Sequence, residues 1–159
     1  MTEISAETRV ELEKRYRTAA FLIFAQIASL LILVVLAFVL VKPENGGQTS
    51  DSTRWMLWVA ALFAALSSFI IRRMLYRWDR LRDLSLLQGI SALIKTLSVN
   101  SIILASMAEI VALVGFVISI LTGDAFEMVR AAVIALVVFI INFPRKSIWE
   151  KIVKNLENV

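Results

Sequence analysis

The sequence predicts an all-α polytopic membrane protein: a single membrane domain over residues 1–159, with about four transmembrane helices in two helical hairpins and amphipathic cytoplasmic flanking helices. Its composition is the first reason, because 59% of the 159 residues are apolar, 19% are charged, and the mean hydropathy is +0.79. Soluble domains have about 45–50% apolar and about 25% charged residues. The second reason is residues 19–41, an uncharged run longer than the roughly 20 residues that cross a bilayer. The third is that basic residues gather between alternate spans.

Residues 1–18 predict a cytoplasmic polar helix that continues into a first span at 19–41. Two acid–base pairs four residues apart favour this helix: Glu11–Arg15 and Glu13–Arg17. A secretory signal peptide has a shorter apolar core and a small-residue cleavage site, so we expect a retained span. Residues 42–54, which include Pro43 and Gly46–Gly47, predict an exposed loop.

The second span is predicted at residues 55–71, where small residues recur at every fourth position. Rows of small residues let two helices approach closely in lipid, so this row is expected to pack against a neighbouring helix. That neighbour can be internal or can belong to another protein. The residues that we single out for helix packing are Ala60, Ala64, Ser68, Ala112 and Gly115.

Residues 72–96 predict an amphipathic cytoplasmic segment that carries six basic residues. Apolar residues recur through it at spacings of three and four: Leu84, Leu87, Ile90, Ile94 and Leu97. We expect this helix to lie at the membrane surface or to extend its neighbouring spans. A calmodulin target has a similar pattern, but a position next to the membrane already explains the charge.

The third and fourth spans are predicted at residues 97–121 and 126–143, joined by a short turn. Residues 144–159 predict a cytoplasmic tail helix, in which Ser147 and Glu150 have the spacing of a capping box. Four apolar residues of this helix predict a face that rests on the membrane surface. They are Ile148, Ile152, Val153 and Leu156.

The distribution of Lys and Arg predicts the orientation. The N-terminal segment has four, residues 72–96 have six and the tail has four, against two in the loop at 42–54 and one at Arg130. Both termini and the central segment are therefore expected in the cytoplasm, and we expect the bacterial inner membrane. Tryptophan and tyrosine are expected at the two membrane edges. They are Trp55 and Trp58 at the outer edge, and Tyr16, Tyr76, Trp78 and Trp149 at the inner edge.

The two halves of the chain resemble each other. Ala25-Gln26-Ile27 in the first span parallels Ala108-Glu109-Ile110 in the third. Trp78-Asp79 after the second span parallels Trp149-Glu150 after the fourth. This pattern indicates two parallel helical hairpins, as in other membrane proteins built from repeats.

Glu109 is the only ionisable residue near the centre of any predicted span. An ionised carboxylate there costs at least ~2.5 kcal/mol, so the group must stay protonated or face a partner or a water-filled cavity. Either condition suits a proton- or cation-binding site, with Gln26, Asn100 and Ser106 as candidate partners. Alternatively, a protonated Glu109 hydrogen-bonds one of these residues and only fastens two helices together. Arg130 is a conceivable salt partner, but it is expected near the outer interface, about half a membrane away.

Residues 105–123 resemble the carboxylate-bearing helix of rotary ATPase proteolipid (c) subunits. In that family a Glu or Asp follows Ala, with small residues along one face of the helix, and Ala108, Glu109, Ala112 and Gly115 match this pattern. The resemblance implies that Glu109 binds and releases the transported ion.

The chain has no cysteine and no histidine, which removes disulfides, thiolate nucleophiles and the commonest metal ligands and general bases. We therefore expect no enzyme, no metal and no cofactor. Because the basic residues flank apolar spans, we expect a lipid bilayer and no nucleic acid as partner. The leading hypothesis is a non-catalytic small membrane subunit or scaffold that associates with a larger membrane complex or with itself. The alternative is a proteolipid-like transport subunit that binds a proton or cation at Glu109.

Overall fold

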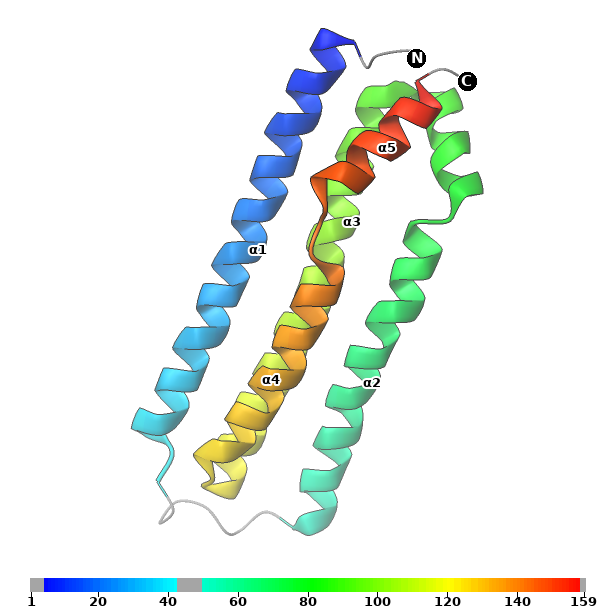
Figure 1. Ribbon diagram of the computed structural model, residues 1–159. Coiled ribbons are helices and arrows are strands. Elements are labelled where there is room, and N and C mark those ends of the chain that lie inside the picture. The colour runs from blue at the N-terminus through cyan, green and yellow to red at the C-terminus, as the bar shows by residue number, and fades with distance from the viewer. Residues whose placement is uncertain (1–4, 43–49, 158–159) are drawn as a thin grey trace.

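The computed structural model describes residues 5–42 and 50–157, which form α-helices joined by short connections. The helices are α1 (Ala6–Leu40), α2 (Asp51–Leu75), α3 (Trp78–Thr122), α4 (Ala125–Asn142) and α5 (Lys146–Leu156), as Figure 1 shows. The predicted all-α class is confirmed. Within the described residues, four segments are long and apolar enough to cross a membrane: α1, α2, α3 and the stretch Ala125–Leu156.

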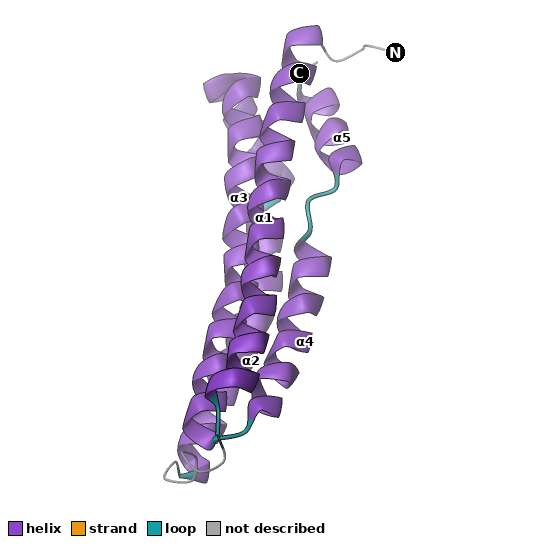
Figure 2. Cartoon of the chain, turned by 90° about the vertical axis from the view of Figure 1, so that its left-hand side faces the viewer, coloured by secondary structure: helices purple, strands orange, loops and turns teal. Residues whose placement is uncertain are grey.

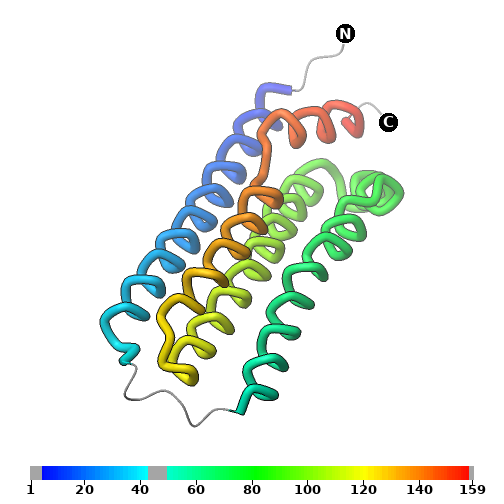
Figure 3. The backbone as a smooth tube through the Cα atoms, turned by 60° about the horizontal axis from the view of Figure 1, so that its bottom comes forward, coloured from blue at the N-terminus to red at the C-terminus, as the bar shows by residue number. Residues whose placement is uncertain are grey.

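The helix α3 lies at the centre of the bundle together with α4. In its most apolar stretch 44% of the residues are buried inside the protein, against 17% for α1 and for α2. Seen in Figures 1 and 3, α1 and α2 lie on opposite flanks, with α3 and α4 between them. In the described part of the chain α1 and α2 do not touch, and each packs against α3 and α4. The first two spans are therefore not packed together as a hairpin, because the third and fourth separate them.

Helix directions bring both ends of the chain together. The helices α1 and α3 run one way and α2 and α4 return, so both termini and the α2–α3 turn lie at one end (Figure 1). At that end the Ser5 backbone N–H and the Thr8 hydroxyl donate to Glu157 Oε1, at 3.3 and 3.0 Å. A short non-helical connection leads from α4 to α5, as Figure 2 shows.

The helices α3 and α4 approach closely at Gly115. A Cβ atom added to this glycine would lie 2.0 Å from Ala131 Cβ, so only glycine fits. Ala112, one turn earlier, is also completely buried. Gly115 therefore lies at the interface between α3 and α4, and Ala112 is buried in the core of the bundle.

On α2 the packing row differs by one position from the predicted one. Ala61, Ala65 and Ser68 are buried, whereas Ala64 is partly buried and Ala60 is exposed. Positions i, i+4 and i+7 follow the 3.6-residue period more closely than steps of four, so they define the stripe that faces the inside of the bundle. Ala60 therefore takes no part in the packing inside the bundle.

The end of the bundle with both termini has its own apolar core, which we call the head. At its centre Trp149 of α5 is 1% exposed and meets Tyr16 of α1 edge to face, with ring centroids 5.7 Å apart. The other core residues are Leu12, Ala19, Leu81, Leu93, Ile94, Leu97, Val153 and Leu156. The tail helix thus buries its apolar face in protein, while Ile148 is 41% exposed. The sequence predicted that this face rests on the membrane surface. In the structure α1 and α3 cover it instead.

Gly89 interrupts α3 within the predicted amphipathic segment. Its φ of +83° is a conformation that side chains other than glycine rarely adopt, and it turns residues 78–88 away from the long axis of α3. The predicted continuous apolar face is broken there, and Leu87 is 83% exposed. Leu93, Ile94 and Leu97, beyond the break, are buried in the head.

Two expected helix starts lie elsewhere. Residues 43–49 of the predicted loop lie outside the described residues. Residues 51–54, which were also predicted as loop, form the first turn of α2. Ser50 caps this turn, and its hydroxyl accepts from the Thr53 N–H at 3.3 Å. The helix α5 begins at Lys146 with no side-chain cap, so the predicted capping box is not formed.

Candidate functional site

Glu109 lies on α3 at the interface with α1, where it is half-buried. Gln26 Nε2 of α1 donates to Glu109 Oε2 at 3.1 Å and to Ser106 Oγ at 3.2 Å. The Ser106 hydroxyl in turn donates to the Ile102 carbonyl at 3.1 Å. Three of the four residues that the sequence singled out therefore meet, and we call Gln26, Ser106 and Glu109 the Glu109 site.

The fourth residue, Asn100, lies elsewhere. Its side chain is 2% exposed and donates to the Leu75 carbonyl at 3.3 Å, which joins α3 to the end of α2. Asn100 precedes Glu109 by nine positions, which at 100° per residue is half a rotation around the helix, whereas Ser106 precedes it by three and shares its face. Asn100 therefore cannot belong to the Glu109 site.

The Glu109 site is polar but incompletely satisfied. Gln26 Oε1 is buried and accepts no hydrogen bond within the described chain. Glu109 has no cation within ion-pair distance among the described residues, and Gln26 and Ser106 are, like Glu109, only partly buried. The site thus combines an acidic group, a hydroxyl and a free amide oxygen at a seam that is not fully covered.

A second carboxylate, Glu127 near the start of α4, is completely buried. Arg54 of α2 and Arg130 of α4 both pair with its Oε1, the latter at 2.6 Å. Trp58 Nε1 of α2 donates to its Oε2 at 2.8 Å. Both oxygens are therefore bound, and charge-assisted bonds of this kind are stronger than neutral ones. We call these four residues the Glu127 site.

The sequence pattern does not indicate the Glu127 site, because Arg54 falls within the predicted loop at residues 42–54 and not on a helix. The signal that could have found it is a pair of spacings: Arg54 and Trp58 are four apart, and Glu127 and Arg130 are three apart. Two of the three basic residues assigned to the outer side thus bind one acid. Arg130 consequently does not pair with Glu109.

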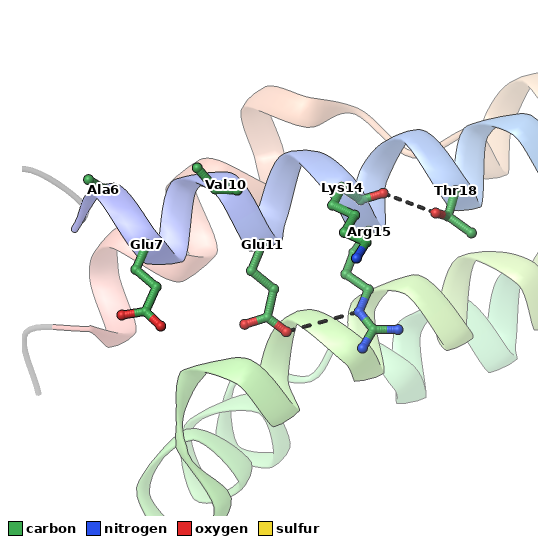
Figure 4. A pocket seen from close by; sticks show the side chains of 7 residues that line it. All are labelled: Ala6, Glu7, Val10, Glu11, Lys14, Arg15 and Thr18. Carbon is green, nitrogen blue, oxygen red and sulfur yellow. Dashed lines mark hydrogen bonds and ion pairs between the residues drawn. The ribbon is translucent and has the colours of Figure 1, made fainter.

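Figure 4 shows a shallow depression along the first turns of α1. It contains the Glu11–Arg15 pair, at 4.0 Å, and the bond from the Thr18 hydroxyl to the Lys14 carbonyl, at 3.0 Å. All of its lining residues belong to one helix: Ala6, Glu7, Val10, Glu11, Lys14, Arg15 and Thr18. Mixed charges on one exposed helix face do not define a binding site, so we assign none here.

Among residues 5–42 and 50–157, no group of three or more His, Cys, Asp or Glu side chains could hold a metal ion. Comparison with known proteins adds no further site, since no protein-family model, no curated protein and no solved structure matches this chain.

Proposed function

We propose that this chain is a non-catalytic integral membrane subunit or scaffold that associates laterally through the Glu109 site. Its partner would be a larger membrane complex or a second copy of the chain. The observation that supports this most directly is the half-buried Glu109 carboxyl group, whose one described partner is a neutral amide. The small residues of α2 and α3 support association less than the sequence suggested, because Ser68, Ala112 and Gly115 already pack inside the bundle.

The uncovered side of the Glu109 carboxyl group gives an energetic reason for association. Acyl chains cannot donate a hydrogen bond, and polar groups left in hydrocarbon without a partner are costly. A helix from another protein that brings a donor to Glu109 would remove this cost. Polar contacts of this kind join membrane helices at about 0.6–2 kcal/mol each.

The surface beside the site suits such a helix. Ala25, which directly precedes Gln26 on α1, is exposed. Small side chains let a second backbone approach closely, which a polar contact in lipid requires. The Glu109 site therefore has both a polar group to cover and room for the helix that covers it.

Cross-linking in native membranes tests the proposal, because the chain has no cysteine of its own. Ala25→Cys places a thiol beside the site, and Val59→Cys places a matched thiol on the exposed face of α2. A short bismaleimide should give a discrete adduct with Ala25→Cys but not with Val59→Cys. Adding Glu109→Ala should reduce that adduct. Equal adducts from both positions, or none from Ala25→Cys, would contradict the proposal.

We also propose that both termini face the cytoplasm of a bacterial inner membrane. The support is the 14 basic residues of the N-terminal, central and tail segments, against three elsewhere. Asp51→Cys should react with an impermeant thiol reagent outside intact cells, whereas Asn155→Cys should react only after the cells are opened. Both positions are exposed. The reverse labelling would contradict the orientation.

A second candidate function is proton or cation binding at Glu109. It is favoured by the buried Gln26 Oε1, an acceptor without a partner beside a carboxyl group and a hydroxyl. Oxygen atoms from these groups could hold a proton or a monovalent cation. Glu109→Gln keeps the shape and a hydrogen-bonding group but cannot exchange a proton. This variant should abolish proton or sodium flux in reconstituted vesicles; if flux and growth are unchanged, the ion-binding function is wrong. The Ala25→Cys adduct should persist in Glu109→Gln if association alone is the function.

A further inference from the structure

A pocket of about 250 Å³ lies at the head, where α2 ends and α4 passes into α5. Its polar lining comes from Arg72, Tyr76, Asn142 and Arg145, and Trp78 lies at its edge with 46% of its surface exposed. Apolar side chains, Leu104 and Phe143 among them, complete the lining. The pocket therefore combines two arginines with an apolar wall at the level where the apolar helices end.

The two arginines have donors to spare. Arg72 donates one hydrogen bond to the Ile141 carbonyl, and a guanidinium carries five N–H donors. Neither Arg72 nor Arg145 has a carboxylate within ion-pair distance in the described part of the chain. Two unneutralised guanidinium groups beside an apolar wall favour an anionic ligand, and phosphate oxygens match their geometry.

Asn142, the last residue of α4, adds a second and independent requirement. It is 6% exposed, and its Nδ2 donates to Ser68 Oγ at 3.4 Å. Its Oδ1 is buried without a hydrogen-bond donor. Because the amide nitrogen is engaged by α2, the free atom is an acceptor, and a bound molecule must supply a donor to satisfy it. A phosphodiester without a further hydroxyl group would satisfy the arginines only.

We propose that this pocket binds the headgroup of an anionic phospholipid whose phosphodiester carries a hydroxyl group, of which phosphatidylglycerol is the type. The phosphate faces Arg72 and Arg145, and a headgroup hydroxyl donates to Asn142 Oδ1. The volume is below the about 300–1,000 Å³ of sites for drug-sized ligands, which suits a headgroup whose acyl chains remain in the bilayer. Basic pockets between membrane helices are known sites for anionic headgroups.

The experiment uses the full chain in mild detergent and measures bound lipid by native mass spectrometry and the melting temperature. Phosphatidylglycerol should bind once per chain and raise the melting temperature. Phosphatidylcholine should do neither, and phosphatidylmethanol, an anionic phosphodiester without a hydroxyl, should bind several-fold more weakly. Free glycerol 3-phosphate separates a soluble ligand from a lipid. If it occupies the site as well as phosphatidylglycerol does, or if phosphatidylcholine or phosphatidylmethanol binds equally, the lipid assignment is overturned.

Two adjacent arginines provide a matched pair of variants. Arg72→Gln should weaken phosphatidylglycerol binding by about tenfold, as expected for one charge-assisted hydrogen bond. Arg73→Gln, exposed and outside the pocket, should bind like the parent. Arg145 is also exposed, and Arg145→Gln should weaken binding as Arg72→Gln does. It decides the test if Arg72→Gln does not fold. An equal loss in Arg73→Gln would show general charge attraction, and unchanged binding in Arg145→Gln would show that the pocket is not the site.

Discussion

Glu109 and Glu127 are two carboxyl groups on apolar helices with opposite surroundings. Glu127 is completely buried, and its oxygens bind two arginines and a tryptophan. Glu109 is half-buried and is bound by one glutamine. The difference follows from their places along the helices. Arginines are tolerated at helix ends, where they reach the membrane surface, so an acid near a helix end can find cations that an acid at mid-span cannot.

This difference separates a carboxyl group that is saturated within the fold from one that is free to take the part we propose for Glu109. Buried charges persist when they are paired, and the Glu127 site is saturated by its own chain. The Glu109 site leaves an amide oxygen without a donor and a carboxyl group partly uncovered. Four substitutions follow, from the largest expected effect to the smallest, and each either sharpens or breaks this contrast.

Glu127→Ala should destabilise the protein most. It leaves Arg54, Arg130 and Trp58 without their common acceptor. Removing one partner of a buried ion pair costs about 3–5 kcal/mol, and we expect about 2–4 kcal/mol here because the arginine side chains are 41% and 58% exposed and can turn to water. The measurement is the free energy of unfolding in mild detergent. A loss smaller than that of Glu109→Ala would break the contrast.

Gly115→Ala should have the second-largest effect on stability, because Gly115 lies at the tightly packed interface between α3 and α4. The new Cβ would lie 2.0 Å from Ala131 Cβ, so the two helices must separate. Overpacking of this kind costs about 1–3 kcal/mol. Ala131→Gly in the same chain should restore part of the melting temperature. If Gly115→Ala alone melts like the parent, the two helices can separate without a loss of stability.

Glu109→Ala should destabilise by about 1–2 kcal/mol or less, through the lost bond to Gln26. Glu109→Gln should keep the parent's melting temperature, because the amide still accepts from Gln26 Nε2 and can donate to its Oε1. The pair of variants is compared in the same detergent as Glu127→Ala. If Glu109→Gln unfolds as readily as Glu109→Ala, the negative charge itself holds α1 to α3.

Glu13→Gln should have the smallest effect. The hydrogen bond from Arg17 and the charge of Lys146 lower the pKa of Glu13 from its ordinary 4.5. A lowered pKa means that the stabilisation is present above the ordinary value and is lost as the pH falls through the lowered one. The melting temperatures of parent and variant should therefore differ slightly at pH 7 and converge once the pH falls below the lowered pKa of Glu13. A difference that grows in acid would contradict this assignment.

The Glu109 site could be predicted in part, because few polar residues lie within the apolar runs of the sequence. Gln26 and Glu109 are rare polar residues in apolar runs, and Ser106 shares a helix face with Glu109. Asn100 was included because polarity alone does not report a helix face, although counting 100° per residue separates it from Glu109. The Glu127 site depended on α2 beginning at Asp51, which the turn-forming residues before it concealed.

The sequence by itself determined the helical class, four segments apolar enough to cross a membrane and the rarity of polar groups within them, because hydropathy and helix period are local properties. Only the tertiary structure decided which helices touch. It placed α3 and α4 between α1 and α2, joined Arg54 to Glu127 and buried Trp149 in the head. These contacts depend on how side chains from distant segments fit against one another, as Gly115 fits Ala131, and spacing along one helix does not contain that information.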